Sequence, residues 1–175
     1  LNKERLSPYD FYQYLFRMPD VDVAKLLKRL TFLELEEIEE IISRVDEPNF
    51  AQKRLAQEVT RLIHGEEGLV EAEKITQAAR PGAQTELKRD VLQSIPNKVL
   101  PKEIVLGKKA VDLLVEAEIV GSKSEARRLI SHGGVYLNNE KVEDEHLILS
   151  PNHLVEGKFL LFGVGKKKKI VISIE

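Results

Sequence analysis

Apolar residues in the first half of the chain recur at the spacing of amphipathic helices. Val23, Leu26, Leu27 and Leu30 stand at i, i+3, i+4 and i+7. The same stripe recurs at Leu35, Ile38, Ile42 and Val45, at Leu55, Val59, Leu62 and Ile63 before Gly65, and at Leu69, Ala72, Ile75 and Ala79 before Pro81. Because each helix must bury its stripe against another, we expect four or five short helices to form an all-α bundle over residues 1–82.

The first helix has a start signal and an unusual content. Ser7 supplies an N-cap hydroxyl, Pro8 takes the first helical position, where its missing N–H does no harm, and Asp10 follows. Five aromatic residues then crowd into the eight positions from Tyr9 to Phe16 and would point nearly all round a helix. Either this is the central helix of the bundle, or a domain outside the chain covers part of it. The start at Leu1, without an initiator Met, favours a trimmed chain.

The pattern changes after Gly82. Residues 83–107 contain Pro96, Pro101 and Gly107, and their one regular apolar patch runs from Leu87 to Ile95. Proline removes a backbone donor and biases the preceding residue away from helix. We therefore predict a linker with one short helix over residues 83–107.

The last part, residues 108–175, mixes helical and strand patterns. The run from Ala110 to Ile119 predicts a short helix that Gly121 ends, and Ser122-Lys123-Ser124-Glu125 is a capping box that starts a second one. Gly133 and Gly134 stop that second helix. Short strands are predicted at 135–137, 141–142, 147–149, 159–162 and 170–174. The fold class expected is thus a helical bundle followed by a small α+β domain.

Composition excludes several classes of protein. Of the 175 residues, 42% are hydrophobic, which suffices for one or two domains with buried cores and excludes wholesale disorder. No apolar run approaches the roughly 18 residues that a membrane span needs, so we expect a soluble protein without a membrane partner. The absence of cysteine removes disulfides, thiolate catalysis and zinc sites built on cysteine.

The net charge of −2 hides an asymmetry along the chain. Residues 1–95 carry 14 Lys and Arg against 18 Asp and Glu, whereas residues 96–175 carry 13 against 11. An acidic half is therefore followed by a basic one. This asymmetry points to a polyanionic partner for the second half alone.

The cations of the second half gather on one helix and one hairpin. A solvated helix face and a solubilising turn would explain each place alone, but four adjacent lysines repel one another unless a polyanion relieves them. Few aromatic residues accompany these cations, so we expect folded RNA read by shape and backbone rather than stacking on single-stranded bases. The candidate RNA-binding residues are Lys123, Ser124, Arg127, Arg128, Lys141, Lys166, Lys167, Lys168 and Lys169.

Signals for other chemistry are weak. The stretch Gly163 to Lys166 is similar to a phosphate loop, yet Leu160 and Lys167 stand where such a loop needs glycine and a hydroxyl residue. His146 and His153 lack a ligand set on one element, and no Gly-x-Ser-x-Gly elbow is present. We predict no catalytic residue, metal site or cofactor in this chain.

The second half resembles a known RNA-binding module. The similarity rests on Ser122-Lys123-Ser124-Glu125-Ala126-Arg127-Arg128-Leu129-Ile130, on Gly133-Gly134-Val135-Tyr136-Leu137-Asn138 and on Val142. These residues resemble the domain named after ribosomal small-subunit protein S-four, over residues 108–175. In that family the helix flank and the following loop grip RNA, which implies contacts by Lys123, Ser124, Arg127 and Arg128.

The first half resembles the helical anticodon-binding domain of bacterial-type tyrosyl-tRNA synthetases. The matching stretches are Leu6-Ser7-Pro8-Tyr9-Asp10-Phe11-Tyr12-Gln13-Tyr14, Leu30-Thr31-Phe32-Leu33 and Ala56 to Glu67. The resemblance implies that Asp20 reads the first anticodon base; capping of the second helix is an equally good role for its carboxylate. In some members an acidic residue of the last hairpin adds a base contact, but this chain has Lys166 to Lys169 there.

Together the resemblances imply the tRNA-binding C-terminal portion of such a ligase. The implied partners are tyrosine tRNA and a catalytic domain of the same polypeptide, in a homodimeric parent protein. ATP and magnesium belong to that catalytic domain, whose signature motifs this chain lacks, so the chain alone should not form tyrosyl adenylate. Arg80-Pro81-Gly82-Ala83 is similar to plant organellar members, which leaves the bacterial cytoplasm, chloroplast and mitochondrion open.

Two other functions stay open on the residues alone. A ribosomal or RNA-modifying factor could carry the same S-four-like module and bind unrelated structured RNAs. A protein-interaction module would instead use the aromatic stretch from Tyr9 to Phe16 and ignore RNA.

Overall fold

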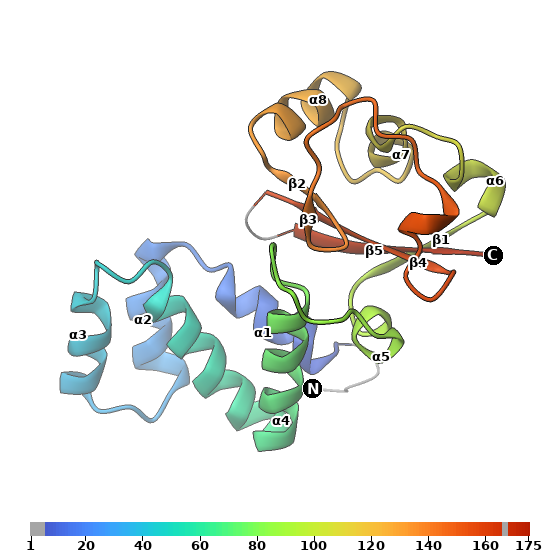
Figure 1. Ribbon diagram of the computed structural model, residues 1–175. Helices are drawn as coiled ribbons and strands as arrows, with labels where there is room; N and C mark the ends of the chain where they lie inside the picture. The colour runs from blue at the N-terminus through green and yellow to red at the C-terminus, as the bar shows by residue number, and fades with distance from the viewer. Residues whose placement is uncertain (1–5, 166–167) are drawn as a thin grey trace. The chain divides into compact units, whose positions relative to one another are not determined.

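The computed structural model describes residues 6–165 and 168–175, and the chain divides into two compact units (Figure 1). The first unit comprises Leu1–Lys74 and the second Ile75–Glu175. Mixed helix and sheet agree with the predicted class. The boundary between the units falls before the predicted limit of the bundle at residue 82, inside the last helix of the first half.

The first unit is built of helices, as predicted. They are α1 (Pro8–Phe16), α2 (Asp20–Leu30), α3 (Leu35–Ser43) and α4 (Phe50–Ala78). The hydroxyl of Ser7 accepts a hydrogen bond from the Asp10 amide at 3.1 Å, which confirms the predicted N-cap of α1. Gly65 has φ 75° and ψ 178°, so it interrupts the helical path of α4. The two helices expected before and after Gly65 are therefore the two halves of α4.

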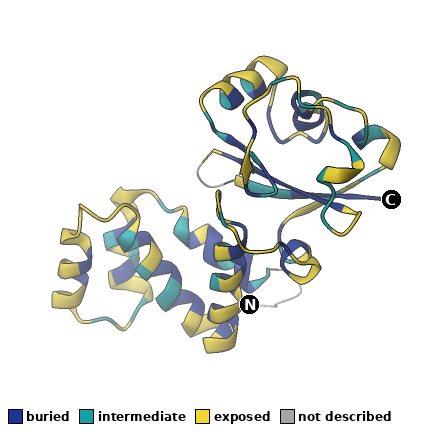
Figure 2. Cartoon of the chain, viewed as in Figure 1, coloured by how far each residue is buried: buried dark blue, intermediate teal, exposed yellow. Residues whose placement is uncertain are grey.

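One hydrophobic core holds the helices of the first unit together. It joins Tyr12 of α1, Leu27 of α2, Ile38 of α3 and Leu55 of α4. Tyr9 and Tyr12 are each only 2% exposed, and Tyr14 is the aromatic of α1 that faces solvent, at 63%. Figure 2 shows the buried faces of these helices directed at one another. Most of the aromatic stretch is thus buried within this chain, which favours the interpretation of α1 as a central helix.

The described part of the second unit contains four short α-helices and a five-stranded sheet. Its helices are α5 (Arg89–Gln93), α6 (Lys102–Val105), α7 (Ala110–Glu116) and α8 (Lys123–Ser131). Its strands are β1 (Asn97–Leu100), β2 (Val135–Leu137), β3 (Glu140–Lys141), β4 (Phe159–Val164) and β5 (Lys168–Ile174), in the order β1-β5-β4-β2-β3. Leu114 of α7 and Ile130 of α8 share a core with Phe162 of β4 and Ile172 of β5. These contacts hold α7 and α8 on one face of the sheet (Figure 1).

The predicted linker is wrong in one respect, because it contributes to the sheet. Residues 83–107 hold α5, β1 and α6, and β1 pairs in parallel with β5, Lys98 lying opposite Ile172. Pro96 and Pro101, which suggested a linker, flank an edge strand instead, where their missing donors are tolerated. The segment is therefore an integral part of the second unit.

Two other local predictions need correction. The strand expected at 147–149 is reduced to a bridge between Ile148 and Lys109. The helix expected to continue to Ile119 ends at Glu116, with Glu118 at a positive φ of 57°. The sequence placed the stop at Gly121 because glycine is the usual residue for that backbone conformation.

Candidate nucleic-acid interface

Helix α8 presents the predicted flank of polar and basic side chains. Ala126 and Ile130 are buried against the sheet, whereas Lys123, Ser124, Arg127 and Arg128 are exposed. Side chains four positions apart lie one above the other on a helix, so these four form two adjacent rows. The structure therefore brings the predicted residues of α8 together on one solvent-facing surface.

The N-terminus of α8 is capped nearly as the sequence indicates. The Glu125 amide donates to the Ser122 hydroxyl at 3.2 Å. The Glu125 carboxylate accepts from the amide of Gly121 at 2.9 Å, one residue before the one a capping box uses. The carboxylate closest in sequence to the basic flank is thus engaged by the backbone.

The C-terminal turn of α8 brings two other basic segments alongside it. Gly133 has φ 67°, and a Cβ added there would lie 2.5 Å from Cε of Lys141, so the lysine of β3 crosses this turn closely. The amide of Gly165, at the turn between β4 and β5, donates to the carbonyl of Gly134 at 2.7 Å. The end of α8, Lys141 and the lysine-bearing turn therefore meet at one corner of the second unit.

The cations of this corner have acidic partners from other elements, which the sequence did not indicate. Lys123 lies 2.6 Å from the carboxylate of Asp112 on α7, and Arg127 lies 3.6 Å from Glu145. Lys123 lowers the pKa of Asp112, chiefly through this hydrogen bond. Lys141 lies 3.8 Å from Glu143. These pairs are exposed and weak, so phosphate groups can compete for the cations.

Arg128 differs from its neighbours. Within residues 6–165 and 168–175, its guanidinium forms no ion pair with an Asp or Glu. Its backbone carbonyl accepts from the Ser131 hydroxyl at 2.9 Å, so the end of the helix is held while the side chain extends into solvent. An exposed arginine without an internal counter-charge suits the bidentate geometry of phosphate.

Two of the four lysines of the last hairpin can be placed. Lys166 and Lys167 lie outside the described residues. The ammonium of Lys168 donates to the carbonyl of Ile119 at 2.5 Å, and that of Lys169 donates to the carbonyl of Ala79. Lys168 and Lys169 therefore bind backbone oxygens on opposite faces of β5 in this structure.

The structure adds basic residues that the sequence analysis missed. Lys109 lies 3.3 Å from Nδ1 of His146, and Lys108 pairs with Glu116 on α7. Both lysines also help to lower the pKa of Asp112, after the larger effect of Lys123. Their signal in the sequence is the lysine doublet directly before α7. Lys108 and Lys109 extend the basic surface from α8 toward the start of α7.

In the first unit, Asp20 is the first residue of α2. The N-cap is Pro19 and makes no side-chain cap hydrogen bond, so the alternative that Asp20 caps this helix is wrong. Asp20 is exposed, and its Oδ1 accepts from the amide of Gln52 on α4. The second carboxylate oxygen has no hydrogen bond to the described residues.

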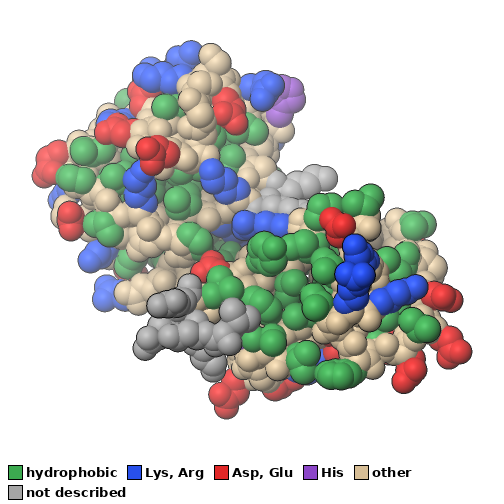
Figure 3. Space-filling model, turned by 180° about the vertical axis from the view of Figure 1, so that it is seen from behind, with side chains coloured by type: hydrophobic (Ala, Val, Ile, Leu, Met, Phe, Trp, Pro, Cys, Tyr) green, Lys and Arg blue, Asp and Glu red, His purple; other side chains and the backbone are tan. Residues whose placement is uncertain are grey.

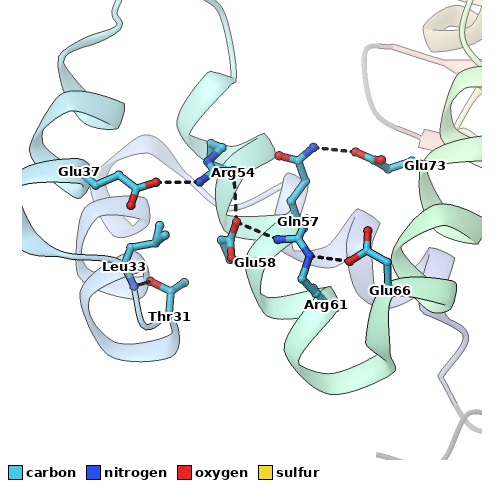
Figure 4. A network of polar contacts seen from close by, with 9 residues as sticks. All are labelled: Thr31, Leu33, Glu37, Arg54, Gln57, Glu58, Arg61, Glu66 and Glu73. Atoms are coloured by element: carbon cyan, nitrogen blue, oxygen red, sulfur yellow. Dashed lines mark hydrogen bonds and ion pairs between the residues drawn. The ribbon is translucent and has the colours of Figure 1, made fainter.

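Two arginines of α4, Arg54 and Arg61, form ion pairs with glutamates of the first unit (Figure 4). Glu58 lies 3.2 Å from Arg54 and 3.0 Å from Arg61. Arg61 also lies 2.8 Å from Glu66, across the interruption of α4 at Gly65, and Glu66 raises its pKa. These arginines are thus shared among carboxylates of their own unit.

The described residues contain no group of three or more His, Cys, Asp or Glu side chains placed to hold a metal ion. None of the helices in residues 6–165 and 168–175 is long and apolar enough to cross a membrane.

Comparison with known proteins assigns both halves to one family. Residues 87–172 match the tyrosine–tRNA ligase SYY-like C-terminal domain, and residues 1–79 match the class I tRNA synthetases for Trp and Tyr. The chain is 47% identical to the tyrosine–tRNA ligase of Protochlamydia amoebophila over 99% of its own length and 43% of that protein. The chain belongs to the tyrosine–tRNA ligase family and corresponds to the C-terminal region of its members.

Relatives of this ligase family come from bacteria and organelles. The chloroplastic/mitochondrial tyrosine–tRNA ligase of Arabidopsis thaliana is 48% identical over 99% of this chain and 36% of that protein. A C-terminally truncated mitochondrial tyrosyl-tRNA synthetase of Aspergillus nidulans is 33% identical over 42% of this chain and 22% of that structure, with a TM-score of 0.40. The chain thus spans less than half the length of the two curated ligases.

Proposed function

We propose that this chain binds tyrosine tRNA as the C-terminal part of a tyrosine–tRNA ligase. The family assignment supports this function, and the observation that carries it is the exposed row of Lys123, Ser124, Arg127 and Arg128 on α8. ATP and magnesium would then act in a catalytic domain of the same polypeptide, in a homodimeric ligase. The second unit would be an S-four-like domain that grips RNA with this helix.

The corner at the end of α8 favours a folded RNA backbone over single-stranded bases. Lys141 of β3 lies beside Gly133 at the end of α8, so cations of α8 and β3 lie around one surface. Of the described aromatics of the second unit, Phe159 and Phe162 are buried in the sheet and Tyr136 of β2 is half-buried, which leaves little for base stacking. Phosphates along a folded RNA can instead meet several of these cations at once.

Asp20 is our proposed base contact in the first unit. Its carboxylate is exposed, and a carboxylate can accept from the imino and amino groups of guanine. Gln52 holds one oxygen, which restrains the side chain and leaves the other oxygen for a base. The two units would then bind one tRNA by different means, and two weak contacts on one RNA reinforce each other.

The test measures the salt dependence of binding to a tyrosine tRNA. In Arg127→Ala/Arg128→Ala, the slope of log affinity against log salt should become shallower by about 1.4–1.8, since each phosphate contact contributes roughly 0.7–0.9. A matched control is Lys102→Ala/Lys158→Ala. Both lysines are exposed and lie at the opposite end of the sheet, beside the end of β5. The control removes two charges but should leave the slope unchanged.

A second comparison separates the ligase from a general RNA-binding factor. The wild-type chain should prefer tyrosine tRNA to a tRNA with a short variable arm. Equal affinity for both would contradict the specific function and favour a ribosomal or modification factor. An unchanged slope in the double arginine variant would remove α8 from the interface.

A further inference from the structure

The segment that joins α7 to α8 has an unusual backbone. Helix α7 ends in a Schellman motif, because the Ile119 amide donates to Leu114 at 2.9 Å and the Glu118 amide to Val115 at 2.9 Å. Glu118 takes the left-handed position with φ 57°. Helix α8 ends in the same motif with Gly133 at that position. The α7–α8 connection therefore holds a side-chain-bearing residue where glycine is strongly favoured.

Two lysines from the sheet bind the carbonyl groups on either side of Glu118. Lys98 of β1 donates to the Ala117 carbonyl at 3.2 Å and lies 2.9 Å from the Glu118 carboxylate. Lys168 of β5 donates to the Ile119 carbonyl at 2.5 Å. Lys98 pairs with Ile172, and strand residues two apart face the same way, so both lysines reach the face that carries α7 and α8.

The position of these carbonyls explains why lysine suits them. Ala117 is the C-cap of α7, and the carbonyl groups at the end of a helix carry partial negative charge and lack helical partners, so the ammonium of Lys98 stabilises its carbonyl. The Ile119 carbonyl lies beyond the helix, where Lys168 supplies it with a charged donor. Lys98 also lowers the pKa of Glu118, chiefly by its hydrogen bond. The Ile119 carbonyl lies three residues before Ser122, the cap of α8. Lys168 thus holds the connection at the point where the RNA-binding helix begins.

We propose that Lys168 is a positioning residue, which sets the place of α8 through the Ile119 carbonyl instead of contacting phosphate. The inference rests on the proposed RNA-binding role of α8. It gives Lys168 a different role from the cations that contact RNA, because Lys168 would hold the α7–α8 connection in place without touching the RNA. Loss of the ammonium should let the α7–α8 connection move in the free chain, so that Lys123, Arg127 and Arg128 must be returned to their places when RNA binds.

The experiment compares three variants of the full chain. Lys168→Met keeps the aliphatic stem and removes the donor, and Lys168→Arg restores a charged donor. Lys169→Met is the matched control, because it removes the same charge at the neighbouring position. Lys169 binds the carbonyl of Ala79 and not the α7–α8 connection. Amide hydrogen exchange is followed in the free chain, and affinity for a tyrosine tRNA is measured across a salt series.

The expected result has three parts. Lys168→Met should speed exchange at residues 119–122 and weaken tRNA binding about three- to tenfold, the size of the net contribution of one ordinary hydrogen bond. The salt slope should stay unchanged, and Lys168→Arg should recover most of the affinity. Lys169→Met should leave exchange at residues 119–122 as it is.

Either of two results would overturn the proposal. A slope shallower by roughly 0.7–0.9 in Lys168→Met, with unaltered exchange, would make Lys168 a phosphate contact. Unaltered exchange and affinity would show that the hydrogen bond positions nothing. Failure of the tRNA-binding function itself is distinguishable, because the wild-type chain would then lack salt-dependent binding while the exchange experiment in the free chain still reports on Lys168.

Discussion

The two units differ in how particular cations are held. In the first unit, Arg44, Arg54 and Arg61 each lie within ion-pair distance of two glutamates. In the second unit, Lys98 and Lys168 bind backbone carbonyls, and Arg128 extends into solvent. Figure 3 shows hydrophobic side chains gathered on the first unit, with few cations among them. These three arginines of the first unit are thus neutralised by glutamates, whereas among the described residues Arg128 of α8 has no such partner.

This difference suggests separate roles for the two units, one in the strength of RNA binding and the other in the choice of RNA. Exposed cations supply the salt-dependent attraction to any RNA backbone, which carries no sequence information. Arginines that are already paired with glutamates, as Arg54 and Arg61 are, add little to that attraction, and a single polar group such as Asp20 can instead contribute a contact to a base. We expect the second unit to determine how tightly RNA binds and the first to determine which RNA binds.

The separate cores provide the most severe test of this comparison. Leu27 of the first core and Leu160 of the second are both fully buried. Replacing either by Ala should destabilise its own unit by about 2–5 kcal/mol, since a cavity replaces packed side chain. Amide exchange should rise within the altered unit. Leu27→Ala should retain the salt slope of RNA binding, and a slope lost equally in both variants would contradict the division of roles.

Alkaline pH should act on the first unit before the second. Burial raises the pKa of Tyr9 from 10.0 to about 12 and also raises that of Tyr12. The stabilising contribution of Tyr9 is complete below pH 10 and is lost as the pH rises through about 12, because the unfolded chain releases this proton first. The loss from Tyr9 alone is about 2–3 kcal/mol.

Tyrosinate absorbance and exchange measured together check this alkaline transition. The buried tyrosines should ionise as the first unit unfolds, between pH 10 and about 12. Tyr9→Phe/Tyr12→Phe should shift the unfolding of that unit to higher pH. Ionisation of both tyrosines with the first unit still protected would show that burial does not govern their titration.

The contrast between the units also explains which features the sequence could predict. Helix caps such as those at Ser7 and Ser122, and the apolar stripes, depend only on residues a few positions apart. These features could therefore be predicted from the sequence. The pairing of β1 with β5 joins segments that are distant in the sequence, and the prolines on either side of β1 led to the prediction of a linker there. Local patterns thus reveal elements, but not the partners that elements find in space.

The candidate site divides along the same line. The row on α8 follows from helical spacing and was predicted residue by residue. The carboxylates of Asp112 and Glu145 reach that row from other elements, and the bond from Lys168 to Ile119 spans 49 positions. Such contacts depend on the tertiary fold, so no spacing rule could have assigned them. Whether a lysine contacts RNA or supports the interface is decided at this level.

The smallest effect we expect is also the most specific. Asp20→Asn keeps an oxygen that can accept from Gln52, but it replaces the second acceptor with a donor. Binding of a tyrosine tRNA with guanine at the first anticodon position should weaken by about 1–2 kcal/mol, within the range of single hydrogen bonds. The same change at Asp22, an exposed carboxylate in the same turn, should have no effect.

The salt series gives this last substitution its meaning. Because Asp20 neutralises no phosphate, Asp20→Asn should leave the salt slope as it is, whereas Arg127→Ala/Arg128→Ala should change it. A tRNA with another base at the first anticodon position should bind wild type and variant equally. If Asp20→Asn instead weakened all tRNAs alike, the carboxylate would serve only to hold Gln52, and the first unit would lose its role in discrimination.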